Sequence, residues 1–138
     1  MWEMAGSVGT ELVDGEKIMA TDDTCVTIVP YFKAQPGKLA NIKTMCDLFV
    51  QKSKTEPKCL YYGFTFNGDE MHCREGYADA EGALAHLENV DALLKQLLGM
   101  AELTRLEVHG PGEELDKMRE PLTELNPAYF ILEYGFRK

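Results

Sequence analysis

The residue best suited to acid–base chemistry in this sequence is His86, which lies in a stretch of helical periodicity beside Leu84 and Leu87. An imidazole titrates close to neutral pH, so it can take up and release a proton under ordinary conditions. In a dry pocket such a side chain would serve as a general base toward a substrate. A histidine whose polar tip reaches the surface, or is hydrogen-bonded within the core, is the alternative that the sequence leaves open.

Glu75 is the second catalytic candidate, because it lies in the middle of a strand-like stretch on the same face as Tyr77. Burial in such a position would raise the pKa of the carboxyl group and make it a usable base. The alternative is a structural ion pair between Glu75 and Arg74 or Arg105.

Four aromatic residues are candidates for the wall of a substrate pocket. They are Tyr61, Tyr62, Phe64 and Tyr77. The tyrosine hydroxyls could donate hydrogen bonds to an anionic oxygen of a substrate. Ordinary core packing explains the same residues without any catalytic role.

The sequence predicts no metal site and no cofactor. His72 and Cys73 are adjacent in a strand-like stretch, so their side chains point to opposite faces and cannot share a metal ion. His86 and His109, the other histidines, add no ligand spacing. Phosphate-binding, dinucleotide-binding, nucleophile-elbow and zinc-protease motifs are all missing from the sequence.

The four cysteines lie in apolar or strand-like stretches, and no two of them form a Cys-x-x-Cys pair. This pattern predicts free, buried thiols in a reducing compartment, with a disulfide or metal framework as the alternative. The cysteines are Cys25, Cys46, Cys59 and Cys73.

The length of 138 residues and the formal net charge of −9 favour one domain that meets small molecules or proteins. The acidic balance disfavours binding to nucleic acid or to anionic membranes. No apolar run approaches the ~20 residues of a membrane span, and residues 1–23 do not resemble a secretory signal. We therefore expect a cytoplasmic protein with an N-terminal extension (1–23) and a single domain (24–138).

Hydrophobic periodicity and turn signals divide the chain into strands and helices. Pro30 should lie at a sheet edge or a bulge, and Pro121 should kink or split the last helix. The expected strands are 25–32, 59–66, 70–77, 103–109 and 128–136, and the expected helices are 38–54, 80–98 in two pieces, and 113–125.

The order of these elements predicts an α+β, ferredoxin-like fold with an antiparallel sheet and an extra C-terminal helix and strand. Helices would cover one face of this sheet. The second strand carries Leu60, Tyr62, Phe64 and Phe66 on one face and Tyr61 on the other. The face without helices therefore needs a cover, and a second subunit is the simplest one. The expected assembly is a homodimer whose two sheets form a barrel.

Three short motifs carry a resemblance to a known family. They are Glu56-Pro57-x-Cys59, Arg74-Glu75-Gly76-Tyr77, and the stretch from Asp79 to Leu87 that contains Ala83-Leu84-Ala85-His86. The chain resembles the antibiotic biosynthesis monooxygenase-like family of dimeric α+β barrels over most of residues 25–109. Lys58 replaces the glycine of that family's Pro-Gly-Cys, and Tyr77 stands where the family often has tryptophan.

The resemblance implies a cofactor-independent oxidation of an electron-rich phenol or quinol, with His86 as the base that deprotonates it. Our first hypothesis is therefore a monooxygenase that acts on a small aromatic compound. A non-enzymatic dimeric module that binds a small ligand or a protein is the alternative. Haem binding or degradation is a third candidate, which the tyrosine at position 77 disfavours.

Overall fold

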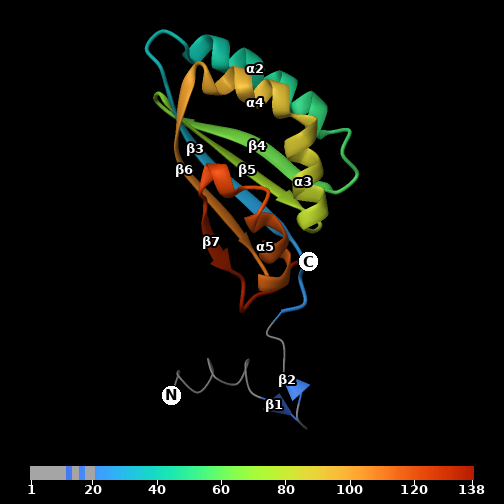
Figure 1. Ribbon diagram of the computed structural model, residues 1–138. Helices are drawn as coiled ribbons and strands as arrows, with labels where there is room; N and C mark the ends of the chain where they lie inside the picture. The colour runs from blue at the N-terminus through green and yellow to red at the C-terminus, as the bar shows by residue number, and fades with distance from the viewer. Residues whose placement is uncertain (1–11, 14–15, 18–20) are drawn as a thin grey trace.

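The computed structural model describes residues 12–13, 16–17 and 21–138 (Figure 1). These residues form a main body of five strands and four helices, preceded by a short pairing of two further strands. The strands are β1 (Leu12–Val13), β2 (Glu16–Lys17), β3 (Val26–Ala34), β4 (Cys59–Asn67), β5 (Glu70–Tyr77), β6 (Ala101–Gly110) and β7 (Ala128–Ile131). The helices are α2 (Leu39–Ser53), α3 (Ala80–Asn89), α4 (Asp91–Leu98) and α5 (Gly112–Arg119), and a 3-10 turn, η1, covers Thr123–Leu125.

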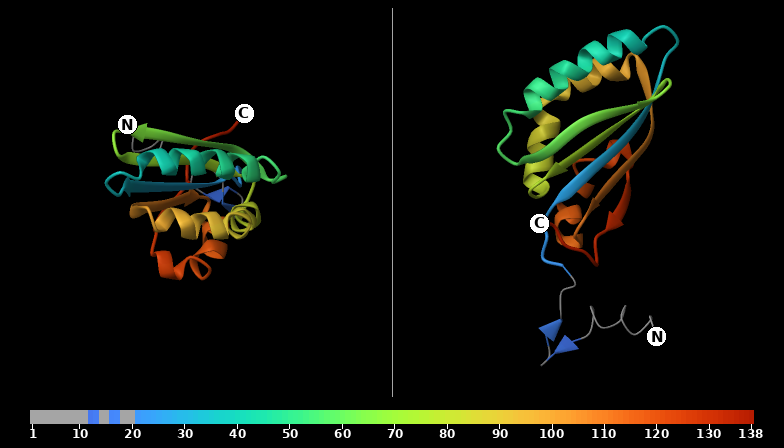
Figure 2. Two further views of the ribbon diagram at one scale, coloured as in Figure 1. Left: turned by 90° about the horizontal axis from the view of Figure 1, so that it is seen from above. Right: turned by 180° about the vertical axis from the view of Figure 1, so that it is seen from behind.

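The main sheet has five strands in the order β4-β5-β3-β6-β7. Every neighbouring pair is antiparallel except β6 and β7, which run parallel. The helices lie on one face, and the view from behind looks onto the face without helices (Figure 2). The predicted α+β, ferredoxin-like fold with an added C-terminal helix and strand is confirmed.

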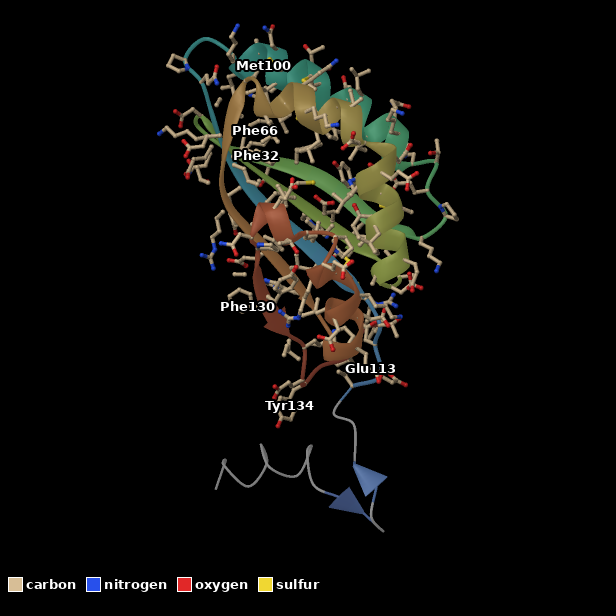
Figure 3. The ribbon with its side chains drawn as sticks, viewed as in Figure 1. Phe32, Phe66, Met100, Glu113, Phe130 and Tyr134 are labelled. Atoms are coloured by element: carbon tan, nitrogen blue, oxygen red, sulfur yellow. The ribbon has the colours of Figure 1, made fainter. Side chains whose placement is uncertain are left out.

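The core lies between the sheet and the helices and consists of two clusters. One cluster surrounds Ile28 and Tyr77 beneath α3 and α5. The other surrounds Phe32 and Ile42 beneath α2 and α4, and Phe66 packs against it (Figure 3). Alternate residues of β3 are buried, because successive side chains of a strand point to opposite faces.

Helix α3 is fixed at both of its ends, and this holds His86 in place. The side chain of Asp79 accepts a hydrogen bond from the Gly82 amide at 2.9 Å and pairs with Lys58 Nζ at 2.8 Å. Such an N-terminal cap satisfies a backbone donor that the helix leaves free. At Val90 the chain leaves α3 and turns into α4.

Two irregularities in strand pairing changed the predicted faces. The register shifts between Cys59 and Tyr61, so Leu60 is an extra residue and is 42% exposed rather than packed beside Tyr62. The pairing of β3 with β6 shifts between Tyr31 and Phe32, next to Pro30. Pro30 was expected at a sheet edge or a bulge, and the bulge is what the structure shows, since β3 is a central strand.

The second shift also separates two residues of β6 that strict alternation placed on one face. Leu103 pairs with Phe32 and packs against the core, whereas Arg105 pairs with Tyr31 and is exposed. Thr104 is the extra residue, and its hydroxyl donates a hydrogen bond to the Tyr31 carbonyl.

The end of the last strand also needs correction. The last strand ends at Ile131 rather than at 136. The last helix is split near Pro121 into α5 and η1, as predicted. At the N-terminus β1 pairs with β2 in a sheet of their own, and residues 1–11, 14–15 and 18–20 lie outside the described part.

The sheet face without helices carries both aromatic and charged side chains. Tyr31 stacks on His72, and the guanidinium of Arg74 lies over the ring of Tyr61. On β6, the exposed Arg105 pairs with a neighbouring glutamate. Of the large β4 side chains, Tyr61 points to this face, whereas Tyr62, Phe64 and Phe66 point toward the helices, as alternation predicted. A covering second subunit stays a prediction.

Gly76 provides a test of this packing. A Cβ at this position would lie within 3.0 Å of three atoms of the Tyr61 side chain, whereas at Gly63 the nearest atom is 3.9 Å away. We expect Gly76→Ala to lower the free energy of unfolding by about 1–3 kcal/mol, the usual cost of overpacking. Gly63→Ala is the matched control, with a small expected effect. In a Tyr61→Ala background, chemical denaturation should show a much smaller cost for Gly76→Ala, and an unchanged cost would contradict this account.

Candidate acid–base site

A cavity of about 60 Å³ lies between the helix-covered face of the sheet and helices α3 and α4, with η1 at its side. Its wall is apolar except for four residues: Tyr62, Cys73, Glu75 and His86. Leu98 and Leu125, which are 39% and 37% exposed, mark where the cavity reaches the surface. The volume is below the roughly 300 Å³ of a typical ligand site, so a ligand must displace leucine side chains at this opening.

Glu75 projects from β5 into this apolar space and is only 5% exposed. The Tyr77 hydroxyl donates a hydrogen bond of 2.6 Å to Glu75 Oε1. Burial raises the pKa of Glu75 to about 7, although the hydrogen bonds from Tyr77 and Cys73 oppose this change. A carboxyl group with such a pKa can both donate and accept a proton near neutral pH.

His86 lies on α3 and is 2% exposed. Its Nδ1 is 2.9 Å from Glu56 Oε2 and 3.0 Å from Oε1, and its Nε2 is 3.4 Å from Glu75 Oε1. Burial lowers the pKa of His86, against the opposing effect of Glu56. The distances alone would suit an ion pair with Glu75, but both pKa directions favour a neutral histidine beside a protonated Glu75.

Glu56 belongs to this candidate site, although the sequence did not single it out. It lies in the loop between α2 and β4, and its side chain is 9% exposed. The Asn89 amide donates hydrogen bonds to Glu56 Oε2 at 2.8 Å and to the Lys52 carbonyl at 3.2 Å. Glu56-Pro57 was visible as a helix stop and as part of a family motif, but neither feature links it to a histidine 30 residues later.

The predicted aromatic wall is found only in part. Tyr62 and Phe64 line the cavity, and the ring of Tyr62 is 5.1 Å from that of His86. Tyr77 does not line the cavity. Its hydroxyl donates a hydrogen bond to Glu75, and the centre of its ring is also 5.1 Å from that of His86. Tyr61 lies on the opposite face of the sheet, so it does not reach the cavity.

The predicted ion pairs of Glu75 are not formed. Arg74 points to the face without helices and lies over Tyr61, and Arg105 pairs with Glu107. Neighbours in a strand point to opposite faces, so Arg74 cannot follow Glu75 into the core. No arginine or lysine lines the cavity, and His86 is therefore the only nearby group among the lining residues that can carry a positive charge.

The four cysteines are free thiols, as predicted, and two of them are buried. Burial raises the pKa of Cys59 to about 11 and that of Cys73 further, so neither serves as a ready thiolate nucleophile. In the part of the chain that the structure describes, no three His, Cys, Asp or Glu side chains gather in a way that would hold a metal ion.

The hydrogen bond from Tyr77 gives a prediction for this pair. Tyr77→Phe removes the donor that stabilises the ionised carboxylate, so the pKa of Glu75 should rise by about one pH unit. Infrared titration of the buried carboxyl band, with Glu75→Gln to assign it, measures this value. Tyr129→Phe, whose hydroxyl bonds to the Met118 carbonyl away from the cavity, is the matched control. A lower pKa in Tyr77→Phe would contradict the assigned hydrogen bond.

Comparison with solved structures places this architecture in a known group. A protein from Caulobacter crescentus that is provisionally named an antibiotic biosynthesis monooxygenase matches with a TM-score of 0.57 and 22% identity, over 62% of this chain and 88% of its own. A protein from Nitrosomonas europaea with the same provisional name matches with a TM-score of 0.59 and 13% identity, over 66% and 93%. The fold is that of the antibiotic biosynthesis monooxygenase-like proteins.

A stronger likeness is to MupZ from Pseudomonas fluorescens, with 46% identity and a TM-score of 0.79 over 83% of this chain and 94% of MupZ. The chain belongs to the same family as MupZ. This likeness covers more of the chain than the likeness to the two more distant proteins. No family model and no curated protein matches the sequence. Within the described residues, no helix is long and apolar enough to cross a bilayer.

Proposed function

We propose that this protein is an enzyme that transfers protons to or from a small, largely apolar substrate without a cofactor, and that Glu75 is its catalytic acid–base group. The observation that supports this most is the buried carboxyl of Glu75, which lines an apolar cavity between the Tyr77 hydroxyl and His86. Perturbed carboxyl groups of this kind, in a water-poor cavity, are typical of catalytic sites.

Oxidation of a phenol or quinol by oxygen is the first reaction to test. The fold is shared with proteins provisionally named as monooxygenases. In such a reaction a base removes the phenolic proton, so that the anion can give an electron to oxygen. Glu75 in its ionised form would take this proton, and Tyr62 and Phe64 would contact the aromatic ring from the cavity wall.

A reaction without redox change is the second candidate, and the charges around the cavity favour it. A substrate anion would lie beside Glu75 with no lysine or arginine in the wall to stabilise it. A protonated Glu75 would instead act as a general acid toward a substrate oxygen, a step in which the substrate loses negative or gains positive charge. Addition, elimination and isomerisation reactions all use such a step.

Oxygen uptake with a panel of quinols and phenols separates these candidates. Uptake by the wild-type protein that is lost in Glu75→Gln supports the oxygenase. Proton exchange or isomerisation of candidate substrates in the absence of oxygen, again lost in Glu75→Gln, supports the second reaction. Ligand binding without any turnover would favour the dimeric binding module instead.

A haem-related role is not proposed. Both nitrogens of His86 face carboxylates, and the side chain is 2% exposed, so it has no free nitrogen for iron.

A homodimer remains part of the proposal, because the sheet face without helices presents half-exposed aromatic side chains such as Tyr31. Light scattering of the purified protein measures its mass directly, and a monomer at high concentration would count against the dimer.

A further inference from the structure

His86 lies between two carboxylates that face opposite edges of its ring. Nε2 faces Glu75 Oε1 at 3.4 Å, and Nδ1 faces Glu56 Oε2 at 2.9 Å. Glu75 lines the cavity, whereas Glu56 does not and belongs to the loop in which Thr55 and Pro57 are exposed. The three side chains therefore connect the inside of the cavity with the surface loop.

Glu75 needs such a connection if it is to work repeatedly. A catalytic acid must regain its proton after each turnover, and the apolar wall offers few routes. Apart from Glu75, the polar groups of the wall are Tyr62, Cys73 and His86. Burial raises the pKa of Tyr62 and of Cys73, so these two hold their protons at neutral pH. Burial also raises the pKa of Tyr77, so its hydroxyl, which bonds to Glu75, holds its proton as well. His86 is the remaining route.

We propose that His86 is a proton relay between Glu75 and Glu56, through which Glu75 exchanges its proton with solvent while the cavity stays closed. The inference rests on the proposed role of Glu75 as the acid–base group. To lose its proton, Glu75 breaks its O–H bond and protonates Nε2. The resulting imidazolium releases the proton on Nδ1 to the Glu56 carboxylate, which passes it to water. Reloading of Glu75 is the reverse, and no electron is transferred.

Asn89 holds the outer end of this relay in place. It binds Glu56 Oε2 and the Lys52 carbonyl at the same time, so the carboxylate is fixed against the edge of His86 that bears Nδ1. The other titratable groups that face His86 are Glu75, Tyr77 and Tyr62, and at neutral pH the two tyrosines are uncharged. In the resting state the neutral His86 therefore carries its proton on Nδ1, as a donor to Glu56, and the unprotonated Nε2 faces Glu75 Oε1 at 3.4 Å.

The resting state can be tested by nitrogen NMR of the histidine rings, with His86→Gln to assign the signal. We expect the Nδ1–H tautomer of His86 in the wild-type protein at neutral pH. In Glu56→Ala the acceptor of Nδ1 is lost, and the Nε2–H tautomer that free histidine prefers should dominate. An Nε2–H tautomer in the wild-type protein would overturn the proposal.

The transfer itself can be tested by following the infrared band of the Glu75 carboxyl after a rapid change of pH. We expect Glu56→Gln and His86→Gln to slow the ionisation of Glu75 by about 100-fold, the lower end of the effect of a positioned proton-transfer group. Glu88→Gln, an exposed change on the same helix, should leave the rate unchanged. Equal rates in the wild-type protein and in Glu56→Gln would overturn the relay.

These two tests need no substrate, so they separate the relay from the proposed function. A Glu75 band that titrates near neutral pH at the same rate in all variants would remove the relay and leave the function standing. If the Glu75 band shows no protonated carboxyl at any pH near neutral, the proposed function fails first, and the relay with it.

Discussion

Glu75→Gln is expected to reduce turnover by about 100-fold or more, the size of effect that a positioned acid or base usually contributes. Glutamine has nearly the shape of glutamate and can still accept the hydrogen bond from Tyr77, but it can neither donate nor accept the proton of the reaction. The loss should therefore fall on kcat, with little change in KM, because the apolar wall that binds the substrate is intact.

Steady-state kinetics of the wild-type protein, Glu75→Gln and Glu88→Gln measure this effect. Glu88 lies on α3 like His86 but is exposed, so Glu88→Gln removes the same charge without touching the cavity. We expect wild-type kcat in this control. Full activity in Glu75→Gln would show that Glu75 is a structural carboxyl and that the chemistry takes place elsewhere.

The second large effect is on stability and its dependence on pH. Burial raises the pKa of Glu75 from 4.5 to about 7, so the folded protein holds a proton there that the unfolded chain releases. The stabilisation that depends on this proton is complete below pH 4.5 and is lost as the pH rises through about 7. The difference amounts to up to about 3 kcal/mol of unfolding free energy at high pH.

Glutamine at position 75 does not ionise, so Glu75→Gln should become more stable than the wild-type protein as the pH rises. Chemical denaturation at pH 5 and pH 8 gives the two free energies of unfolding. Between pH 5 and pH 8, the free energy of unfolding of Glu75→Gln should rise relative to that of the wild-type protein by about 2.5 kcal/mol, and that of Glu88→Gln should not. If the difference in free energy of unfolding between Glu75→Gln and the wild-type protein were the same at pH 5 and pH 8, Glu75 would ionise as an exposed carboxyl does.

The fold was largely predictable because it depends on local signals. The apolar stripe from Leu39 to Val50 predicted α2, and Asn67-Gly68-Asp69 predicted the turn between β4 and β5. The predicted strand faces were wrong at Leu60 and Leu103, since alternation assumes an unbroken ladder and each bulge adds one residue that breaks the alternation. Nothing in the local sequence at either position identifies the extra residue.

Of the three acid–base groups of the candidate site, only the two that line the cavity, Glu75 and His86, could be predicted from the sequence. Glu75 and His86 stood out because a carboxylate and a histidine occur on otherwise apolar faces, and the structure places them 3.4 Å apart. Glu56 did not stand out, because its partner is 30 residues away and the contact depends on how the loop before β4 returns to α3. Tyr61 is excluded from the cavity because it alternates with Tyr62, whose side chain lines the cavity, so Tyr61 points to the other face of the sheet.

The most direct test of the central claim is the titration of the Glu75 carboxyl group itself. Carbon NMR of glutamate side chains in the wild-type protein, with Glu75→Gln to assign the resonance, follows its protonation from pH 4 to pH 9. The predicted result is a single carboxyl that titrates near pH 7 and moves to higher pH in Tyr77→Phe. A Glu75 resonance that titrates near 4.5, as an exposed glutamate does, would contradict the acid–base site.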